Sequence, residues 1–507
     1  MTQHFDILIV GAGSAGSVLA SRLSEDASLT VGLIDAGGWP DDPDIAKPAM
    51  WPLLQGRPYD WCYETVPQPH TAGRTHPWPR GRLIGGSSCL HAMAHVRGHP
   101  RDFDAWVDAG GDAWSFDALL PYFKRSERFS GGADDYHGAD GPLDVLLPTS
   151  GLNPVTQAYM AASQAIGIEA SGDHNGAHMA GAAPNSLTLR DGKRASVADA
   201  YLTPDVIRRP NLTILTDVLV DRARIEANRA TGLLVHGEGA SEVISADRIV
   251  LSAGAVASPM ILMRSGIGDA AQLARHGIGC VVDNPSVGDN LHDHLLAAGN
   301  VYRATRAVPP TNYQLSESLL YYGGGEAGPP SVVVACVVVP VVTEAFAAPE
   351  IGTAYTFMFG VCHPRSRGRL TLSSADSRAK PRIDPAYLSE PDDRATFREA
   401  LDLARSVGNA APMDEWRAEE LLPGPSIQEP SDVDHFIARA AMTHHHPVGT
   451  CRMGSEGDGV VDGALKLHGL DNVFVVDASV VPRITTGPIN AAIIAMAERA
   501  ADLLSAS

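Results

Sequence analysis

The sequence has few cysteines and no excess of positive charge, and each absence excludes a class of protein. No two of the six cysteines form a CxxC pair, which is unlike a zinc site or a disulfide scaffold and favours reduced thiols. They are Cys62, Cys89, Cys280, Cys336, Cys362 and Cys451. Asp and Glu number 59 against 39 Lys and Arg, and the formal charge of −20 opposes nonspecific binding to nucleic acid or to an anionic membrane.

Long hydrophobic runs are also missing. The most apolar run, residues 332–342, is shorter than the roughly 20 residues of a membrane-spanning helix and contains Pro340, so we expect a buried strand. The first strand pattern begins within five residues of Met1, which leaves no room for a secretory signal. We therefore expect a soluble, cytoplasmic protein, and 507 residues predict two domains rather than one compact core.

The stretch FDILIVGAGSAG at residues 5–16 predicts a nucleotide-binding turn. The apolar run at 7–10 indicates a strand, a helical pattern follows, and Gly11, Gly13 and Gly16 between them have GxGxxG spacing. Gly11 permits the tight turn, Gly13 lets backbone approach a pyrophosphate, and Gly16 lets the helix pack on the strand. Free N–H groups at the start of the helix attract the phosphate charge.

A second expected strand, residues 30–34, delivers Asp35. An acid about 20 residues after such glycines can accept hydrogen bonds from both ribose hydroxyls, which argues against the 2′-phosphate of NADP. The pattern by itself leaves NAD and FAD open.

Small residues follow strand patterns again further along the chain. A glycine-serine loop occupies residues 85–88, and an expected strand at 248–251 runs into small residues and a helix at 260–263. A last strand at 473–476 precedes Asp477 and a helix over about 488–504. These pieces predict one nucleotide-binding domain assembled from segments at both chain ends and in the middle.

Residues 297–440 have a different character and indicate an inserted domain. They contain long apolar strand patterns, such as 331–339 and 355–359, and amphipathic helices from Asp392 onward. No internal repeat and no long low-complexity tract is present.

Five motifs in one order give the chain a family resemblance. They are GAGSAG at 11–16, GRLIGGSS at 81–88, GAVASPMILMRSGIG at 254–268, SVGDNLHDH at 286–294 and HPVGTCRMG at 446–454. With them the chain resembles the GMC (glucose-methanol-choline) oxidoreductases over essentially its whole length. The resemblance implies FAD as the cofactor and an oxidoreductase that acts on alcohols.

The resemblance also implies an α/β fold, α+β overall. It consists of a Rossmann-like FAD-binding domain built from discontinuous segments and a substrate-binding domain with an antiparallel sheet flanked by helices. We expect the FAD-binding domain to take residues 1–145, 185–296 and 441–507, and the substrate-binding domain to take 146–184 and 297–440.

The resemblance places the family's active-site histidine at His446, just before Pro447. Oxidising an alcohol requires a base for the hydroxyl proton and a hydride acceptor, which is flavin N5 in these enzymes. The usual pKa range of histidine suits the proton transfer. In an extended segment His444 would point to the same side as His446 and His445 to the opposite side, so His444 is expected to contact substrate.

A metal is not expected, because three adjacent histidines do not converge easily on one ion. His292 and His294 are expected to serve structure or flavin packing. The family's second active-site position, usually His or Asn, falls here on Pro488, which has no side-chain donor. Proline is also favoured in the first turn of a helix for structural reasons, and the neighbouring Asn490 is a substitute donor or a flavin contact.

The position of His91 predicts noncovalent FAD, because relatives that attach the flavin through a histidine in this loop have it one position earlier, at Leu90 here. Residues expected to bind the cofactor lie in the glycine turn, the acid after it, the second loop and the later strand ends. They are Gly11, Gly13, Ser14, Ala15, Gly16, Asp35, Ala36, Arg82, Gly85, Gly86, Ser87, Ser88, His91, Ala92, Val218, Ala253, Gly254, Asp477, Ala478, Asn490 and Ala491.

The expected reaction is oxidation of a small primary alcohol to an aldehyde, with O₂ reduced to H₂O₂. GGSSCLHAM at 85–93, PNSL at 184–187 before RDGKR, the triple histidine and GPI at 487–489 are similar to one particular alcohol oxidase of the family. A second hypothesis is a choline-type or other alcohol dehydrogenase that passes electrons to a quinone or carrier. A third is a flavin-fold protein that binds nucleotide without turnover, and the oligomeric state is left open.

Overall fold

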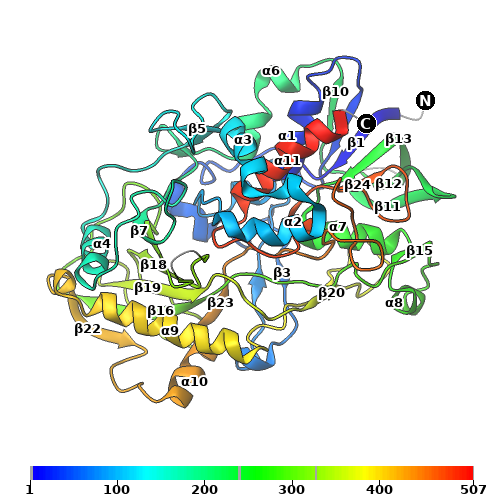
Figure 1. Ribbon diagram of the computed structural model, residues 1–507. Coiled ribbons are helices and arrows are strands. Elements are labelled where there is room, and N and C mark those ends of the chain that lie inside the picture. The colour runs from blue at the N-terminus through cyan, green and yellow to red at the C-terminus, as the bar shows by residue number, and fades with distance from the viewer. Residues whose placement is uncertain (1–3, 238–240, 326–327, 506–507) are drawn as a thin grey trace.

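The computed structural model describes residues 4–237, 241–325 and 328–505. Two seven-stranded sheets organise the chain, one near each end of the molecule in Figure 1. The mixed α/β fold predicted from the sequence is confirmed. No helix of the described residues is long and apolar enough to cross a membrane.

The first sheet has the strand order β10-β2-β1-β13-β12-β11, and β24 pairs with the last residues of β13, 249–251, beyond those that pair with β12. The pairs among β10, β2, β1, β13 and β24 are parallel, whereas β12 pairs antiparallel with both β13 and β11. The strands are β1 (His4–Val10), β2 (Val31–Ile34), β10 (Leu212–Leu215), β11 (Leu219–Glu226), β12 (Arg229–His236), β13 (Glu242–Leu251) and β24 (Val473–Val475).

Helices begin just beyond the carboxyl ends of three parallel strands. They are α1 (Ser14–Leu23) after β1, α7 (Gly254–Arg264) after β13 and α11 (Asn490–Ser505) after β24. Because parallel strands end at one edge of the sheet, the three helix starts gather at that edge, where nucleotides bind in open α/β sheets.

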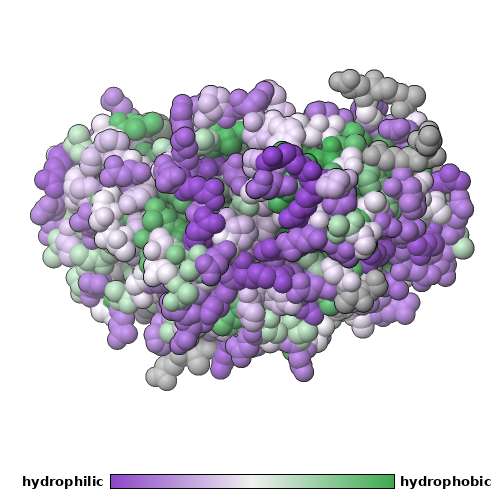
Figure 2. All heavy atoms as spheres, turned by 90° about the horizontal axis from the view of Figure 1, so that it is seen from above, coloured by the Kyte–Doolittle hydropathy of each residue, from purple (hydrophilic) through white to green (hydrophobic). Residues whose placement is uncertain are grey.

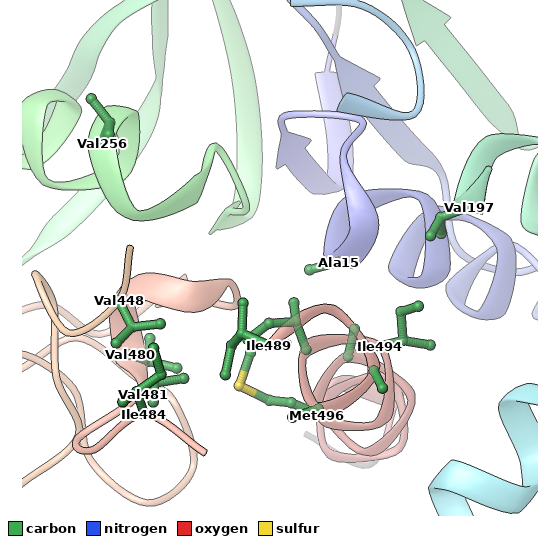
Figure 3. Packing of buried hydrophobic residues seen from close by; sticks show 14 of the residues in the cluster. Ala15, Val197, Val256, Val448, Val480, Val481, Ile484, Ile489, Ile494 and Met496 are labelled. Atoms are coloured by element: carbon green, nitrogen blue, oxygen red, sulfur yellow. The ribbon is translucent and has the colours of Figure 1, made fainter. Parts of the chain in front are cut away.

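Helix α11 joins the two ends of the chain. In Figure 1 it lies beside α1, and in Figure 3 Ile489, Ile494 and Met496 surround its start near Ala15 of α1. Arg22 Nε lies 2.9 Å from Glu498 Oε2, and Glu498 is completely buried between the helices. A charge pair out of water needs such close geometry, so the pairing fixes how the last helix meets the first.

The second sheet is antiparallel throughout and has the order β22-β16-β19-β18-β17-β7, with β23 also pairing with β16. Its strands are β7 (Gly181–Pro184), β16 (Leu295–Ala304), β17 (Ser318–Tyr322), β18 (Val332–Val337), β19 (Ala354–Val361), β22 (Arg417–Leu422) and β23 (Ala441–Thr443). Of the apolar run 332–342, which the sequence predicts to be a buried strand, only residues 332–337 form strand β18, in which every residue is buried.

The two faces of the second sheet have different roles. One face packs against helices, with Phe357 of β19 next to Tyr159 of α4 (Pro154–Ala165) and Phe359 next to Phe397 of α9 (Pro391–Gly408). Alternate residues on the other face form a separate apolar cluster that includes Leu319, Ala335 and Met358. That second face borders the cavity described below.

The remaining elements are short. They are β3 (Tyr63–Glu64), β4 (Pro77–Trp78), α2 (Asp104–Gly110), α3 (Phe116–Ser126), β5 (Glu127–Phe129), β6 (Leu143–Val145), β8 (Leu189–Arg190), β9 (Lys193–Arg194), α5 (Val197–Tyr201), α6 (Pro204–Ile207), β14 (Ile267–Gly268), α8 (Ala270–Arg275), β15 (Val282–Asp283), β20 (Arg369–Thr371), β21 (Arg382–Asp384) and α10 (Pro430–Ala440). Single 3₁₀ turns occupy Pro48–Leu53, Pro69–Thr71, Gly86–Cys89, Pro100–Phe103, Asp112–Trp114, Ala411–Met413 and Ala478–Val480.

Element types agree with the sequence analysis, and the differences lie at the boundaries. Strand β13 begins at Glu242 instead of 248, because its first half pairs with β12 in a hairpin. Helix α11 begins at Asn490 instead of 488. The domain boundaries stay a prediction, and β7 and β23 both pair within the second sheet.

Figure 2 shows hydrophilic side chains over most of the face seen from above, with hydrophobic residues exposed only in patches between them. Such a surface is ordinary for a globular protein with its apolar residues in a core. The six cysteines all lie within the described residues and form no disulfide there.

Candidate active site

A cavity of about 1230 Å³ lies between the first sheet and the apolar face of the second. It contacts the glycine turn, the loop at 85–88, the strand ends of the first sheet and the histidines at 444–446. Most residues predicted to bind cofactor or substrate therefore share one space. These are Gly11, Gly13, Ser14, Ala15, Asp35, Ala36, Arg82, Gly86, Ser87, His91, Ala92, Val218, Ala253, Gly254, Asp477, Ala478, Asn490, Pro488, His444 and His446.

Four predicted residues do not line this cavity: Gly16, Gly85, Ser88 and Ala491. Gly16 packs against the turn itself, since a Cβ there would lie 1.8 Å from the carbonyl oxygen of Gly11. Ser88 Oγ donates to the carbonyl of Gly85, so this pair shapes the loop. Ala491 is buried in α11.

The glycines at the cavity wall differ in what surrounds them. A Cβ on Gly11, whose φ is +95°, would lie 2.6 Å from the carbonyl oxygen of Ser252, so only glycine fits this turn. A Cβ on Gly86 would lie 2.8 Å from Gly13 Cα, which shows how closely the two loops approach. By contrast, the nearest atom to a Cβ on Gly13 is 4.0 Å away, and none lies within 4 Å at Gly254. These open backbone positions fit the pyrophosphate of a dinucleotide.

Asp35 holds the turn together as well as bordering the cavity. Its Oδ2 accepts from the N–H of Ala12 and its Oδ1 from that of Gly37, each at 2.8 Å. Burial raises the pKa of Asp35 to about 6 even though both backbone donors oppose the shift. Each carboxylate oxygen keeps a second lone pair, so contact with a ribose stays a prediction.

Asp477 and Asn490 link separate segments around the same space. Asp477 Oδ2 accepts from the N–H of Gly254 at 2.8 Å and from Ser258 Oγ at 2.6 Å, which ties the end of β24 to the start of α7. Asn490 Oδ1 accepts from Ser14 Oγ at 2.6 Å, which ties the start of α11 to the start of α1. Both contacts hold helix starts at the edge of the sheet where a phosphate would bind.

His91 borders the cavity beside the second loop. Its Nδ1 accepts from the N–H of Met93 at 2.9 Å and lies 3.2 Å from Arg194 Nη1. Burial, followed by the charge of Arg194, lowers the pKa of His91 to about 3, so the ring is neutral.

Hydrogen bonds fix the orientation of His446. Its backbone N–H donates to Asp293 Oδ1 at 2.7 Å, and the Nδ1 of its ring lies 2.9 Å from Nδ1 of His294. The other ring nitrogen of His294, Nε2, is 2.8 Å from the carbonyl oxygen of Cys362. His294 and Asp293 are both buried, with 4% and 2% of their surfaces exposed.

This chain of contacts also fixes the tautomer of His446. A carbonyl oxygen only accepts, so His294 Nε2 carries the proton that is donated to Cys362. In neutral His294 the Nδ1 is then an acceptor, and His446 must donate to it from its own Nδ1–H. The Nε2 of neutral His446 is therefore left unprotonated, as a general base requires.

Burial keeps these rings neutral. It lowers the pKa of His294 to about 4 and of His444 to about 3, with neighbouring histidines adding to the effect on His444. The pKa of His446 lies well below its usual value, first because of burial and then because of His444 and His294. His446 thus has its lone pair free at neutral pH.

The histidine segment is not extended as the sequence analysis assumed. Strand β23 ends at Thr443, and His445 has a φ of +66° in the left-handed region. The rings of His444 and His446 still lie together, with centroids 4.4 Å apart, but His445 borders the cavity too. Arg80 Nη2 donates to the carbonyl of His445 at 2.8 Å and so anchors the turn.

Sequence reasoning missed Asp293 and Arg80 as parts of this site, and it gave His294 a role only in structure or flavin packing. The motif DNLHDH contains Asp293 and His294, but their spacing gives no sign that they meet residues about 150 positions later. Asp293 Oδ2 also accepts from Thr443 Oγ1 at 2.6 Å, which attaches the start of the histidine segment to β16. Position in the fold, not local pattern, identifies them.

Comparison with known proteins gives matches over nearly the whole chain. Family profiles described as GMC oxidoreductase match residues 5–296 and 364–497. Pyridoxine 4-oxidase of Microbacterium luteolum is 49% identical over 98% of both chains. An oxygen-dependent choline dehydrogenase of Pseudomonas aeruginosa is 38% identical and covers 99% of this chain and 95% of its own. The crystal structure of pyridoxine 4-oxidase from Mesorbium loti is 50% identical with a TM-score of 0.97 over 99% of each chain.

Proposed function

The chain belongs to the GMC oxidoreductases, and we propose that it oxidises the 4-hydroxymethyl group of pyridoxine to the aldehyde, with FAD as cofactor and O₂ as electron acceptor. Oxidation of an alcohol by FAD is the activity of the family. The observation in the site that supports it best is the hydrogen bond from His446 to His294, because it leaves a neutral base with a free nitrogen at the cavity.

The chain's own residues fit a flavin dinucleotide. Gly13 and Gly254 leave open backbone where a pyrophosphate fits, and Val218 lines the same cavity as His446. FAD, when bound, supplies the acceptor for the hydride that leaves the carbinol carbon. We assign no covalent attachment to His91, whose Nδ1 already accepts from Met93.

His446 takes the hydroxyl proton of the alcohol through Nε2. As the proton arrives the ring becomes an imidazolium, whose Nδ1–H still donates to His294. Asp293 accepts from the backbone N–H of His446 and so fixes the position of the segment that carries the ring. His444, with its ring 4.4 Å from that of His446, is placed to hydrogen-bond the alcohol, and Pro488 closes the wall where relatives carry a side-chain donor.

The second sheet offers an apolar surface to the substrate. Leu319, Ala335 and Met358 are adjacent in register across three strands, and all three line the cavity. A flat apolar surface suits a planar aromatic ring, because ring and side chains leave water together. This feature favours a heteroaromatic alcohol.

The same cavity fits choline less well. Its described lining contains three carboxylates, Asp35, Asp217 and Asp477. Asp35 and Asp477 belong to the nucleotide end, and Asp217 lies beside Gly38, next to Asp35. A quaternary ammonium needs a carboxylate or an aromatic face. Trp51, Trp61 and Tyr63 also line the cavity, but the apolar sheet face of Leu319, Ala335 and Met358 supplies neither group.

The test is anaerobic addition of pyridoxine to the purified holoenzyme while the flavin absorbance is followed. We expect bleaching, formation of an aldehyde, and recovery of the colour with one H₂O₂ per aldehyde when air is admitted. Choline serves as the comparison substrate. Bleaching by choline and not by pyridoxine would overturn the substrate, whereas bleaching by pyridoxine without reoxidation in air would overturn oxygen as the acceptor.

A further inference from the structure

Three histidines at the end of the cavity form a cluster that has not been assigned a role as a group. His294, His444 and His446 each place one ring nitrogen so that all three lie within 4.8 Å of one another. The sequence argument against a metal concerned the adjacent histidines 444–446. In the structure the third member comes instead from the end of the SVGDNLHDH motif, and convergence no longer depends on one short segment.

We propose that His294, His444 and His446 bind one divalent transition-metal ion of the Zn²⁺ class, and that this ion excludes the alcohol. The ion is an inhibitor here, not a resident cofactor. Three imidazoles are a ligand set that Zn²⁺, Cu²⁺ and Ni²⁺ prefer, whereas Mg²⁺ and Ca²⁺ prefer oxygen.

The geometry is close to what a tetrahedral ion requires. With Zn–N bonds of about 2.0–2.1 Å, two nitrogens on the same ion lie about 3.3 Å apart. The Nδ1 atoms of His294 and His446 are 2.9 Å apart and share one proton. The ion takes the place of that proton: the Nδ1–H bond of His446 breaks, the proton moves to Nε2 of the same ring, and two nitrogen–metal bonds form to two neutral imidazoles. The ligating nitrogen of His444 lies within 4.8 Å of the other two, so its ring has to move closer to complete the third contact.

Outer contacts already hold two of the ligands as metal sites require. The Nε2–H of His294 donates to the carbonyl of Cys362, and the backbone N–H of His446 donates to Asp293. Histidines in metal sites are oriented by a hydrogen bond from their second ring nitrogen, as in His294, whereas the bond of His446 to Asp293 comes from the backbone and fixes its segment. His444 and His446 line the cavity, so a water molecule that completes the coordination would reach the ion from that side.

Binding of the ion and productive binding of the alcohol exclude each other, because the alcohol must donate its hydroxyl proton to Nε2 of His446, and Nε2 carries a proton once the ion holds Nδ1. The exclusion rests on the proposed function of His446, whereas binding of the ion itself does not. The two parts therefore need separate measurements.

The first measurement is equilibrium dialysis of the untagged holoenzyme against Zn²⁺, followed by elemental analysis. We expect one Zn²⁺ per chain in the wild type and also in the control variant His435→Asn, which changes an exposed histidine of α10 and leaves the three ligands in place. His444→Asn and His294→Asn should each weaken this binding by about tenfold or more. His294 is buried, so His444, which is only partly buried, provides the test if the other variant does not fold. Equal Zn²⁺ binding in wild type and His444→Asn would overturn the site.

The second measurement is the anaerobic rate of flavin reduction with Zn²⁺ present, each variant being compared with its own rate without metal. Inhibition should be relieved by chelator and by raising the alcohol concentration, should be stronger with Cu²⁺ than with Zn²⁺, and should be absent with Mg²⁺. Specific Zn²⁺ binding without slower flavin reduction would overturn the exclusion of alcohol. If no alcohol reduces the flavin at all, the proposed function fails while the dialysis result still decides the metal site.

Discussion

His294 accepts a hydrogen bond from His446, and the two Nδ1 atoms lie 2.9 Å apart although 152 positions separate the residues in the chain. The opposite nitrogen of His294 is fixed by the carbonyl of Cys362 at 2.8 Å. The direction of these two bonds decides which nitrogen of His446 is free. A residue without a place in the expected chemistry thereby sets the protonation state of the proposed base.

Exchange of His446 for Ala removes the base. We expect flavin reduction by pyridoxine to slow by about 10²–10⁴-fold, the usual contribution of general base catalysis. Anaerobic stopped-flow absorbance measures the rate, with His435→Asn as the control for loss of an exposed histidine. A near-normal rate in His446→Ala would remove this residue as the base.

His294 acts through His446 as a positioning residue. In His294→Leu the Nδ1–H of His446 loses its acceptor, so both tautomers become populated and the rate of flavin reduction falls. In His294→Asn the amide oxygen takes the place of Nδ1, and we expect much of the rate to return. The pH profile of the rate distinguishes a positioning role from a general loss of structure. The apparent pKa of the base should change in His294→Leu and stay near the wild-type value in His294→Asn. Equal loss in both variants with an unchanged profile would contradict the positioning role.

Gly16→Ala should reduce the flavin content of the purified protein. The new Cβ would lie 1.8 Å from the carbonyl oxygen of Gly11, so the turn and the start of α1 have to separate. The ratio of flavin to protein absorbance measures the loss. Gly279→Ala is the matched control, since no atom lies within 4 Å of its added Cβ. Full flavin content in Gly16→Ala would show that this packing is not needed for binding.

The flavin should come away from the protein under denaturing conditions. Leu90 stands where relatives with covalent FAD have histidine, and Nδ1 of His91 is engaged by Met93. Acid precipitation should leave the yellow colour in the supernatant, and mass spectrometry should give the mass of the unmodified chain. Colour that stays in the pellet would disprove noncovalent binding.

Stability should decline as the pH falls below about 6.5. Burial lowers the pKa of His76 and of His294 to about 4 in the folded protein, so the unfolded chain binds more protons between about pH 6.5 and 4. In that window, each of these two histidines lowers the free energy of unfolding by up to about 1.4 kcal/mol for every pH unit that the pH falls. His137 has the opposite effect on stability. Hydrogen bonds to Asp173 and Glu127 raise its pKa to about 9 against the effect of burial. Its stabilising contribution is therefore present below about pH 6.5 and is lost as the pH rises through 9.

Thermal unfolding of the holoenzyme across pH 4 to 9 measures both effects. We expect the highest Tm near neutrality and a shallower acid decline in His76→Gln, where the buried histidine is gone. A Tm that stays constant from pH 7 to 4.5 would contradict the shifts.

The amino-acid sequence by itself determined the nucleotide end of this protein. Strand, glycine turn, helix and Asp35 follow each other within about thirty residues, and each has a local cause: β-branched residues for the strand, positive φ at Gly11, close packing at Gly16. The family resemblance then supplied FAD and His446, because its motifs occur in order along the chain.

Only the tertiary structure decided how the proposed base is held. The pairing of β16 with β23 brings the end of the SVGDNLHDH motif next to the histidine segment, and no periodicity in either segment encodes that meeting. The left-handed turn at His445 likewise depends on Arg80 from a distant loop. Local patterns fix which elements form, whereas the tautomer of His446 and the convergence of three histidines depend on distances between elements, which only packing sets.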